Sequence, residues 1–203
     1  VTTSATGNYL SWGPEFINLP AFNSSYETMN VIRTETKVAV LDTGVQTDHK
    51  RLAGRVIPGK INVSTSGKRN DASDDNGHGT QTAGAIIDST CDSVKVIPYK
   101  VMDCYGNGTT VGAAAGIICA IKDGVDVINM SFGFYENSPT LELAVKKAYQ
   151  AGILLVAAAG NNATNSPCYP ADYEEVIKVS AVNEQGTIAN FSNYGNVDIA
   201  APG

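Results

Sequence analysis

Residues 37–44, Lys37-Val-Ala-Val-Leu-Asp-Thr-Gly44, form an apolar run that ends in an acid and a glycine turn. The apolar side chains follow one another without polar alternation, which is typical of a parallel strand covered on both faces. Similar runs recur along the chain and predict further strands at 94–101, 125–130, 153–158 and 176–182. The chain is therefore predicted to contain a parallel sheet.

Helical patterns lie between these predicted strands, at 80–87, 109–122 and 138–152. Ser138-Pro139 opens the last of them with an N-cap and a proline at the first helical position. Leu141, Val145 and Tyr149 form its predicted apolar stripe. The alternation of strands and helices indicates one α/β domain with a doubly wound parallel sheet.

Length and composition are those of a single globular domain. The 203 residues carry 20 acidic and 14 basic side chains, a net charge of −6, and 43% of them are hydrophobic. Such a chain can bury a real core and is not a disordered segment. The acidic balance argues against a nucleic-acid groove. The longest apolar run, residues 152–160, is too short to span a membrane.

The four cysteines, Cys91, Cys104, Cys119 and Cys168, are too few and too irregular for a disulfide scaffold or a zinc site. Cys91 and Cys104 flank the predicted strand 94–101, whose eight extended residues place its ends roughly 26 Å apart, beyond disulfide reach. That pair is not expected to form a disulfide. The number and spacing of the cysteines do not indicate whether the protein works in an oxidising or a reducing compartment.

Polar residues follow several predicted strands, at the edge where an open parallel sheet binds ligands. Asp42, Ser131 and Asn161 each come after one of these strands, and His78 stands between two glycines where a helix is predicted to begin. An acid, a histidine and an amide are most of the catalytic groups of a serine hydrolase. The acid orients the histidine, the histidine acts as general base, and the amide donates a hydrogen bond to an oxyanion.

Four motifs carry a family resemblance: Val38-Ala-Val-Leu-Asp-Thr-Gly-Val45, Asn76-Gly-His-Gly-Thr-Gln-Thr-Ala-Gly84, Asn129-Met-Ser-Phe-Gly133 and Val156-Ala-Ala-Ala-Gly-Asn161. With shorter matches in the same order over nearly the whole chain, the sequence resembles the subtilisin-like serine proteases (subtilases, peptidase family S8). The resemblance implies a three-layer α/β/α architecture and an endopeptidase that acts through an acyl-enzyme. It also implies that Asp42 is the triad acid, His78 the base and Asn161 the oxyanion-hole amide.

The resemblance further implies the substrate-binding residues. Two short segments form the walls of the pocket for the residue before the scissile bond: Ser131, Phe132 and Gly133, and Ala158, Ala159 and Gly160. The edge that pairs with extended peptide substrate is formed by Gly106, Asn107 and Gly108. Cys168 stands at the pocket floor, where family members often have glycine, and neutral Asn162 follows Asn161. Together they predict medium-sized, uncharged side chains before the cleaved bond.

The family's nucleophile lies in a motif of the type Gly-Thr-Ser-Met-Ala, and no such motif occurs in residues 1–203. Ser131 and Ser192 match family positions that are not the nucleophile. We therefore expect residues 1–203 to be the N-terminal portion of a subtilisin-like catalytic domain. The nucleophile serine is expected in a C-terminal segment of the same protein, and the chain by itself is expected to be inactive and poorly folded.

Parts of the sequence are also compatible with two other functions. A catalytically dead, subtilisin-like pseudoprotease would bind peptide in the same cleft without cutting it. An aspartic protease would use Asp42-Thr-Gly44, but such enzymes need a second Asp-Thr/Ser-Gly, and the sequence has none. The resemblance implies a peptide or protein substrate and an extracellular or cell-surface location.

No cofactor is required for the expected chemistry. Many subtilisins bind calcium tightly through an acid a few residues after the catalytic Asp, but Arg51 occupies that place and the loop at 88–92 is short. A tight calcium site near Arg51 is therefore not expected. The resemblance implies a weak structural calcium or sodium site at three backbone carbonyls, those of Ala171, Tyr173 and Val176. Asp74 and Asp75 are interpreted as a solvated acidic loop, with a metal site as the alternative.

Overall fold

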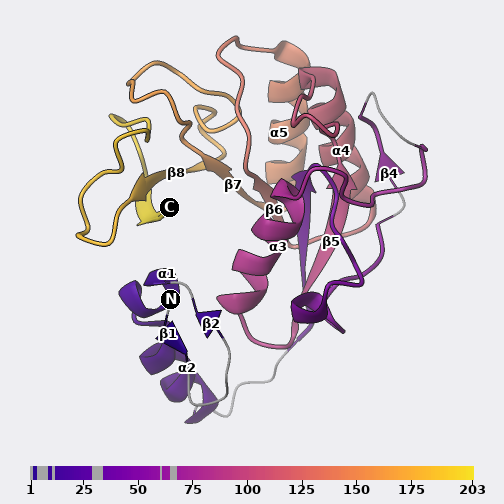
Figure 1. Ribbon diagram of the computed structural model, residues 1–203. Coiled ribbons are helices and arrows are strands. Elements are labelled where there is room, and N and C mark those ends of the chain that lie inside the picture. Colours follow the sequence, from indigo (N-terminus) through magenta and orange to yellow (C-terminus); the bar gives the residue numbers. More distant parts are fainter. Residues whose placement is uncertain (1, 4–8, 11, 29–33, 60, 65–67) are drawn as a thin grey trace.

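The computed structural model describes residues 2–3, 9–10, 12–28, 34–59, 61–64 and 68–203. Its strands in the main sheet are β3 (Thr36–Asp42), β4 (Ile61–Asn62), β5 (Val94–Lys100), β6 (Val127–Met130), β7 (Leu154–Ala158), β8 (Ile177–Val182) and β9 (Ile199–Pro202). Among the described residues these seven strands pair in the order β4-β5-β3-β6-β7-β8-β9, and every neighbouring pair is parallel (Figure 1). The predicted parallel sheet is confirmed.

The helices that cover this sheet are α3 (His78–Asp88), α4 (Thr110–Lys122) and α5 (Pro139–Gln150). The N-terminal part adds α1 (Trp12–Phe16), α2 (Leu19–Thr28) and an antiparallel pair, β1 (Thr2–Thr3) with β2 (Tyr9–Leu10). Helix α1 contacts β9 at the edge of the main sheet. None of the helices in the described ranges is both long enough and apolar enough to cross a membrane.

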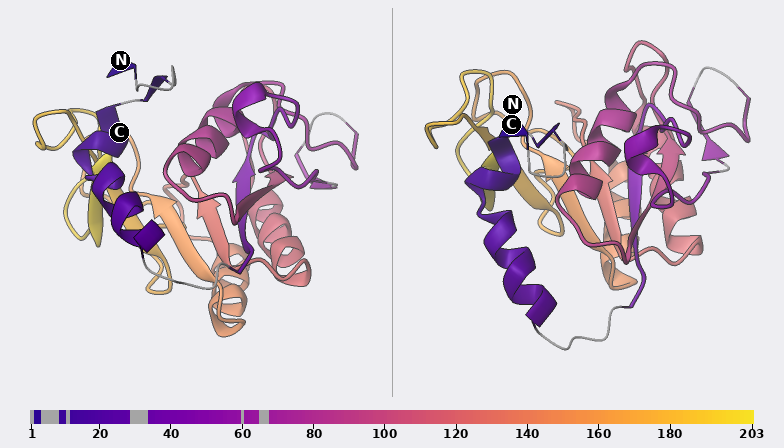
Figure 2. Two further views of the ribbon diagram at one scale, coloured as in Figure 1. Left: turned by 90° about the horizontal axis from the view of Figure 1, so that it is seen from below. Right: turned by 60° about the horizontal axis from the view of Figure 1, so that its bottom comes forward.

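Alternate residues of β3 point to opposite faces of the sheet, as the pleat of a strand requires. Leu41 belongs to the larger core cluster, with Ile117 of α4 and Val145 of α5. Val40 belongs to a second cluster, with Ala83 of α3. Figure 2 shows α3 on one side of the sheet and α4 and α5 on the other. The predicted doubly wound, three-layer α/β/α architecture is therefore confirmed.

Helix α5 begins as predicted, because the Ser138 side chain accepts a hydrogen bond from the N–H of Leu141. Leu141 and Val145 of the predicted stripe are completely buried, but Tyr149 is 59% exposed. The prediction was wrong for Tyr149. The buried face of the helix continues at Ala148, seven positions after Leu141, and Tyr149, eight positions after Leu141, lies outside it.

Candidate active site

Asp42 is the last residue of β3, and it is completely buried. Its Oδ1 accepts the N–H of Thr43 at 2.7 Å and lies 2.7 Å from Nδ1 of His78, while Oδ2 accepts the hydroxyl of Thr82 at 3.4 Å. A buried carboxylate needs partners of this kind because losing water around an unpaired charge is costly. The end of β3 thus holds an acid directly against the histidine.

His78 is the first residue of α3, and its side chain is 48% exposed, so the ring links the buried acid to the solvent side. Gly77 before it has a φ of 110°, in the left-handed region that glycine adopts without strain. The hydrogen bond with Asp42 raises the pKa of His78 against the opposing effect of partial burial, and the charges of Asp42 and Asp74 add to the increase. Because Nδ1 faces Asp42, Nε2 is the nitrogen left for proton transfer.

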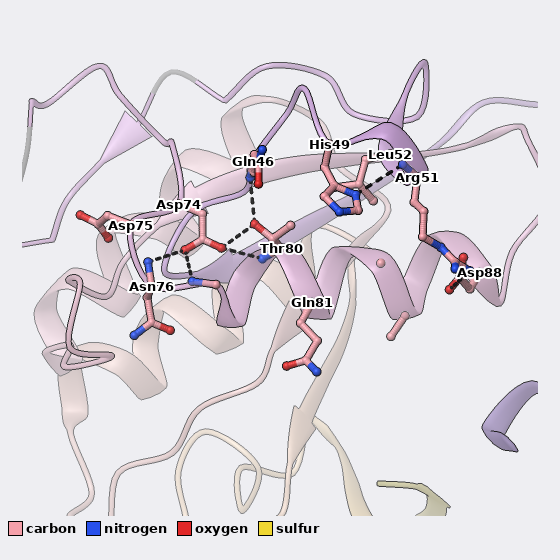
Figure 3. A pocket seen from close by; sticks show the side chains of 13 residues that line it. Gln46, His49, Arg51, Leu52, Asp74, Asp75, Asn76, Thr80, Gln81 and Asp88 are labelled. Carbon is pink, nitrogen blue, oxygen red and sulfur yellow. Dashed lines mark hydrogen bonds and ion pairs between the residues drawn. The ribbon is translucent and has the colours of Figure 1, made fainter. Parts of the chain in front are cut away.

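Asp74 organises the turn that leads into α3 (Figure 3). Its carboxylate accepts five hydrogen bonds, from the N–H groups of Asn76, Gly77 and Thr80 and from the hydroxyls of Thr43 and Thr80. Burial alone would raise the pKa of Asp74, but the hydrogen bonds of this turn outweigh that effect and lower it to about 2. Asp74 is therefore a partly buried residue whose carboxylate is bound by the turn, rather than one surrounded by solvent alone.

Thr43 and Lys100 hold the chain directly after Asp42. The Thr43 hydroxyl donates to Asp74 at 2.8 Å and accepts the N–H of Gly79 at 3.0 Å, which ties this residue to α3. Lys100, at the end of β5, is buried, and its Nζ donates to the Thr43 carbonyl and to Asp75, both at 2.6 Å. Asp75 is thus paired with a lysine. No group of three or more His, Cys, Asp or Glu residues that could hold a metal occurs in the described part of the chain.

An open cleft of about 840 Å³ lies between α3 and the strands β6 to β9. His78 lines it from α3, and Asn161, an exposed residue, lines it from the loop that follows β7. The lining also includes four of the predicted pocket residues, Ser131, Ala158, Ala159 and Gly160. The structure thus brings His78, which contacts the buried Asp42, and the predicted amide of Asn161 to one cleft. Phe132 is not part of this lining, because its ring packs edge-on against Phe134 beside the core.

Cys168 lies against both predicted pocket walls. A Cβ added to Gly133 would lie 2.2 Å from its Sγ, and one added to Gly160 would lie 3.1 Å from it, so the thiol fills the space between the two glycines. Burial raises the pKa of Cys168, and the charge of Asp172 adds to the increase. Asp172 accepts the N–H of Cys168 at 2.8 Å and pairs with the buried Lys178 at 2.7 Å. The thiol is therefore a neutral, fixed group.

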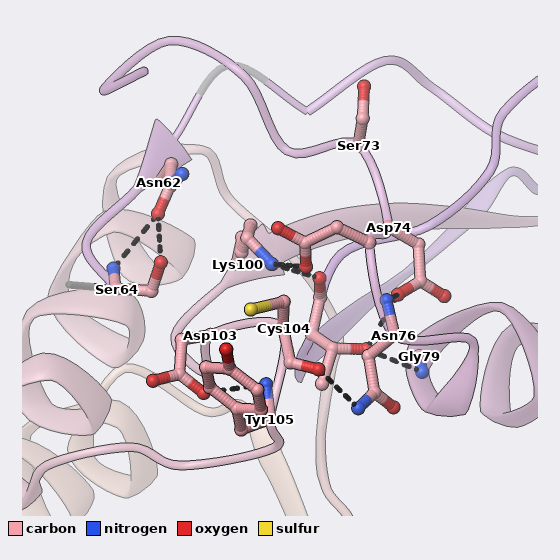
Figure 4. Close-up of polar contacts among 12 residues, drawn as sticks. Asn62, Ser64, Ser73, Asp74, Asn76, Gly79, Lys100, Asp103, Cys104 and Tyr105 are labelled. Carbon is pink, nitrogen blue, oxygen red and sulfur yellow. Dashed lines mark hydrogen bonds and ion pairs between the residues drawn. The ribbon is translucent and has the colours of Figure 1, made fainter. Parts of the chain in front are cut away.

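The predicted substrate edge, residues 106–108, is a turn after β5 that does not line this cleft. The Asp103 carboxylate accepts the N–H of Asn107 at 2.9 Å, and the N–H of Asp103 donates to the Asn107 carbonyl at 2.9 Å. The side chain of Asn76 donates to the carbonyl of Cys104 at 2.9 Å (Figure 4). That bond connects this turn to the turn before α3.

Two arginines lie near the loop after α3. No tight calcium site is expected in this region. Arg51 pairs with Asp88 at 2.8 Å (Figure 3). The guanidinium of Arg55 donates to oxygens of the loop after α3: the carbonyls of Thr90, Cys91 and Val94, the hydroxyl of Thr90 and the carboxylate of Asp92. These oxygens already surround a cationic group. The weak cation site at the carbonyls of Ala171, Tyr173 and Val176 stays a prediction.

Comparison with known proteins gives a consistent assignment. The model of the Subtilase family matches residues 33–203. The thermostable alkaline protease of Halalkalibacterium halodurans is 39% identical over 212 aligned positions, which cover 100% of this chain and 55% of the relative. The minor extracellular protease Epr of Bacillus subtilis is 35% identical over 99% of this chain and 31% of the relative. The present chain thus spans about half or less of the length of these relatives.

A solved structure shares the fold as well. The crystal structure of a cold adapted subtilisin-like serine proteinase matches with a TM-score of 0.77 at 32% identity, over 86% of this chain and 65% of that chain. The family match, the similarity to proteases along this chain and the common parallel sheet agree with one another. The chain belongs to the subtilase family of subtilisin-like serine proteases.

Proposed function

We propose that the protein containing this chain is a serine endopeptidase, with Asp42 and His78 as the acid and base of an Asp-His-Ser triad. The observation that carries the proposal is the 2.7 Å contact between Oδ1 of the buried Asp42 and Nδ1 of the half-exposed His78. Asp42 orients the ring and stabilises its protonated form. Nε2 of His78 then takes the proton of the nucleophile and gives it to the leaving amine.

The nucleophile serine is proposed to come from a segment that follows Gly203. Two of the serines that line the cleft already make hydrogen bonds: Ser131 accepts the Asn129 amide at 2.9 Å, and the buried Ser192 donates to the carbonyl of Asn193 at 3.0 Å. The greater length of the relatives supports a further segment. The cleft over β6 to β9, which Gly203 also lines, supports a place for that segment against the sheet.

Asn161 is proposed to donate its side-chain amide to the oxyanion of the tetrahedral intermediate, together with the backbone N–H of the nucleophile. The serine oxygen attacks the peptide carbonyl, and the amine leaves with the proton from His78. A water molecule then attacks the acyl-enzyme while His78 takes its proton. His78 gives that proton to the departing serine oxygen, which releases the acid product and restores both the serine and the neutral histidine.

Peptide and protein chains are the proposed substrates. Residues 106–108 would pair with the extended substrate backbone. The segments 131–133 and 158–160 would enclose the side chain before the scissile bond. The thiol of Cys168 between Gly133 and Gly160 supports a shallow pocket for medium-sized, uncharged side chains.

No cofactor is proposed for the chemistry, and no tight calcium site is proposed near Arg51, whose guanidinium pairs with Asp88. A weak structural calcium or sodium site at the carbonyls of residues 171, 173 and 176 remains part of the proposal. The protein is proposed to act outside the cell or at its surface, which the name of the Bacillus subtilis relative supports. Detection in the culture medium rather than in the cell lysate tests this location.

The test of the function is to prepare the intact protein and residues 1–203 alone, and to measure peptide hydrolysis and urea unfolding of both. We expect the intact protein to hydrolyse peptides and His78→Ala to lower kcat by about 10⁴-fold or more. We expect residues 1–203 to be inactive, to unfold at lower urea, and to regain activity when the downstream segment is added. An intact, folded protein that binds peptides without cleaving them would favour the pseudoprotease. Activity that survives His78→Ala would contradict the triad.

A further inference from the structure

Asn193 is completely buried beneath the loop that carries Asn161. Its Nδ2 donates to the carbonyl of Ala159 at 2.9 Å, and its Oδ1 accepts the N–H groups of Asn162 at 2.9 Å and Thr164 at 3.4 Å. The side chain therefore contacts the loop both before and after Asn161. Only a group that donates and accepts at once can make this set of bonds, which is a property of a side-chain amide.

Residues 191–194, the segment that carries Asn193, also contact the loop through their backbone. We refer to this segment as the clamp. The N–H of Asn193 donates to the carbonyl of Gly160 at 2.8 Å, the carbonyl of Phe191 accepts the N–H of Ala163 at 2.9 Å, and the N–H of Tyr194 donates to the carbonyl of Thr164 at 3.0 Å. The clamp thus contacts the loop on both sides of Asn161 through backbone as well as side-chain groups.

Two residues of the loop that carries Asn161 have positive φ angles. Ala163 has a φ of 50°, in the left-handed region that costs a residue with a Cβ roughly 1 kcal/mol or more. Gly160 has a φ of 109°, and a Cβ at this position would lie 2.5 Å from Nδ2 of Asn193. The side chain of Asn193 therefore packs directly on the backbone that precedes Asn161.

The clamp is in turn attached to the sheet. The hydroxyl of Ser192 accepts the N–H of Ala181 in β8 at 2.9 Å and donates to the carbonyl of Asn193 at 3.0 Å. Ser192 is itself buried, so neither bond competes with bulk water. A rigid strand therefore supports the clamp, and the clamp supports the loop.

We propose that Asn193 is a positioning residue that fixes the side-chain amide of Asn161 at the oxyanion site. The inference rests on the proposed serine-protease function, in which Asn161 touches the oxyanion and Asn193 does not. Stabilisation of an oxyanion depends on donors that are already in place before the charge develops. Loosening the loop should therefore lower kcat, whereas binding of the uncharged substrate should change little.

The experiment is a double-mutant cycle in the intact protease, with kcat and KM measured for a peptide substrate. Asn161→Ala is expected to lower kcat by about 10²–10³-fold with a small change in KM. Asn193→Asp keeps the Oδ1 acceptor but removes the donor to Ala159, and is expected to lower kcat by about 10-fold or more, with KM changed by less than about 3-fold. In the Asn161→Ala background, Asn193→Asp is expected to lower kcat by no more than about a further 3-fold. The side-chain amide that Asn193 is proposed to position is already absent from that variant.

Val145→Ala, a core change on the far face of the sheet, is the control for destabilisation and is expected to leave kcat unchanged. If Asn193→Asp does not fold, Asn193→Ser is measured by the same criterion. An unchanged kcat for the folded Asn193 variant, or the same loss in both backgrounds, would overturn the positioning role. An unchanged kcat for Asn161→Ala would instead overturn the oxyanion role that the proposed function assigns.

Discussion

Nδ1 of His78 and Oδ1 of Asp42 lie 2.7 Å apart although 36 residues separate them in the chain. The contact follows from the fold, because β3 ends at Asp42 and α3 begins at His78. Thr43 joins the two ends through its own hydrogen bonds to Asp74 and Gly79. The pair is therefore fixed by hydrogen bonds to its surroundings, which is what the proposed proton transfer at a defined atom requires.

The first prediction concerns the titration of His78. Asp42→Asn removes the charged acceptor that raises the pKa of His78, so the pKa is expected to fall. In the wild type, the contact contributes stability that is fully present below the unfolded pKa of about 6.5 and is lost as the pH rises through the higher folded value. NMR titration of the ring measures both proteins. A wild-type pKa equal to or below that of Asp42→Asn would contradict the prediction.

The second prediction concerns the close approach of α3 to the loop after β3. A Cβ on Gly79 would lie 2.0 Å from the carbonyl oxygen of Gly44, so Gly79→Ala must displace backbone next to His78. We expect a loss of about 1–3 kcal/mol in unfolding free energy and at least about tenfold in kcat. Gly84→Ala in the same helix meets no atom within 4 Å and is expected to stabilise by about 0.5–1 kcal/mol. Urea unfolding and peptide hydrolysis compare the two, and equal effects would contradict the argument.

The third prediction concerns the loop after α3. The side chain of Arg55 is 12% exposed and donates to several loop oxygens, so Arg55→Lys is expected to cost about 1.5–3 kcal/mol. Arg51→Lys alters a more exposed ion pair with Asp88 and is expected to cost about 0–1 kcal/mol. Thermal unfolding with and without a chelator measures both effects. A large chelator effect in the wild type that Arg55→Lys abolishes would show that a metal, rather than Arg55, holds the loop.

The fourth prediction concerns Cys168 as the proposed floor of the substrate pocket. Cys168→Gly removes the thiol that lies between Gly133 and Gly160, so the pocket should deepen. We expect kcat/KM for peptides with Phe or Tyr before the cleaved bond to rise relative to those with medium-sized side chains. Cys119→Ser on α4 is the matched control and is expected to leave the ratio unchanged. Profiling on a peptide library gives the ratio; a strict preference for Arg or Lys in the wild type would contradict this account of specificity.

Much of the fold could be predicted because the central strand β3 contains an unbroken apolar run, and helices α4 and α5 begin at side-chain caps, Thr109 and Ser138. The elements that escaped prediction include the N-terminal helices α1 and α2 and the two strands at the edges of the main sheet. Strand β4 has two residues and β9 has four, and each pairs with a single neighbour in the main sheet. Local sequence carries little information about such strands, because their pairing is decided by tertiary contacts.

The same distinction holds for the site. The motifs placed Asp42, His78 and Asn161 at strand or helix ends, and the structure brings them to one region. The supporting contacts could not be predicted. Asp74 bonds to Thr43 and Asn193 bonds to Asn162, in each case across 31 residues and partly through backbone groups that leave no pattern in the sequence.

The central claim is that this chain supplies the acid and base for a serine that lies beyond Gly203. Treating the intact protein with a serine-directed fluorophosphonate and locating the modified residue by mass spectrometry tests it directly. The account predicts one modified serine, C-terminal to Gly203, whose labelling is lost in His78→Ala. Modification of a serine within residues 1–203, or the absence of labelling in a folded protein that hydrolyses peptides, would contradict it.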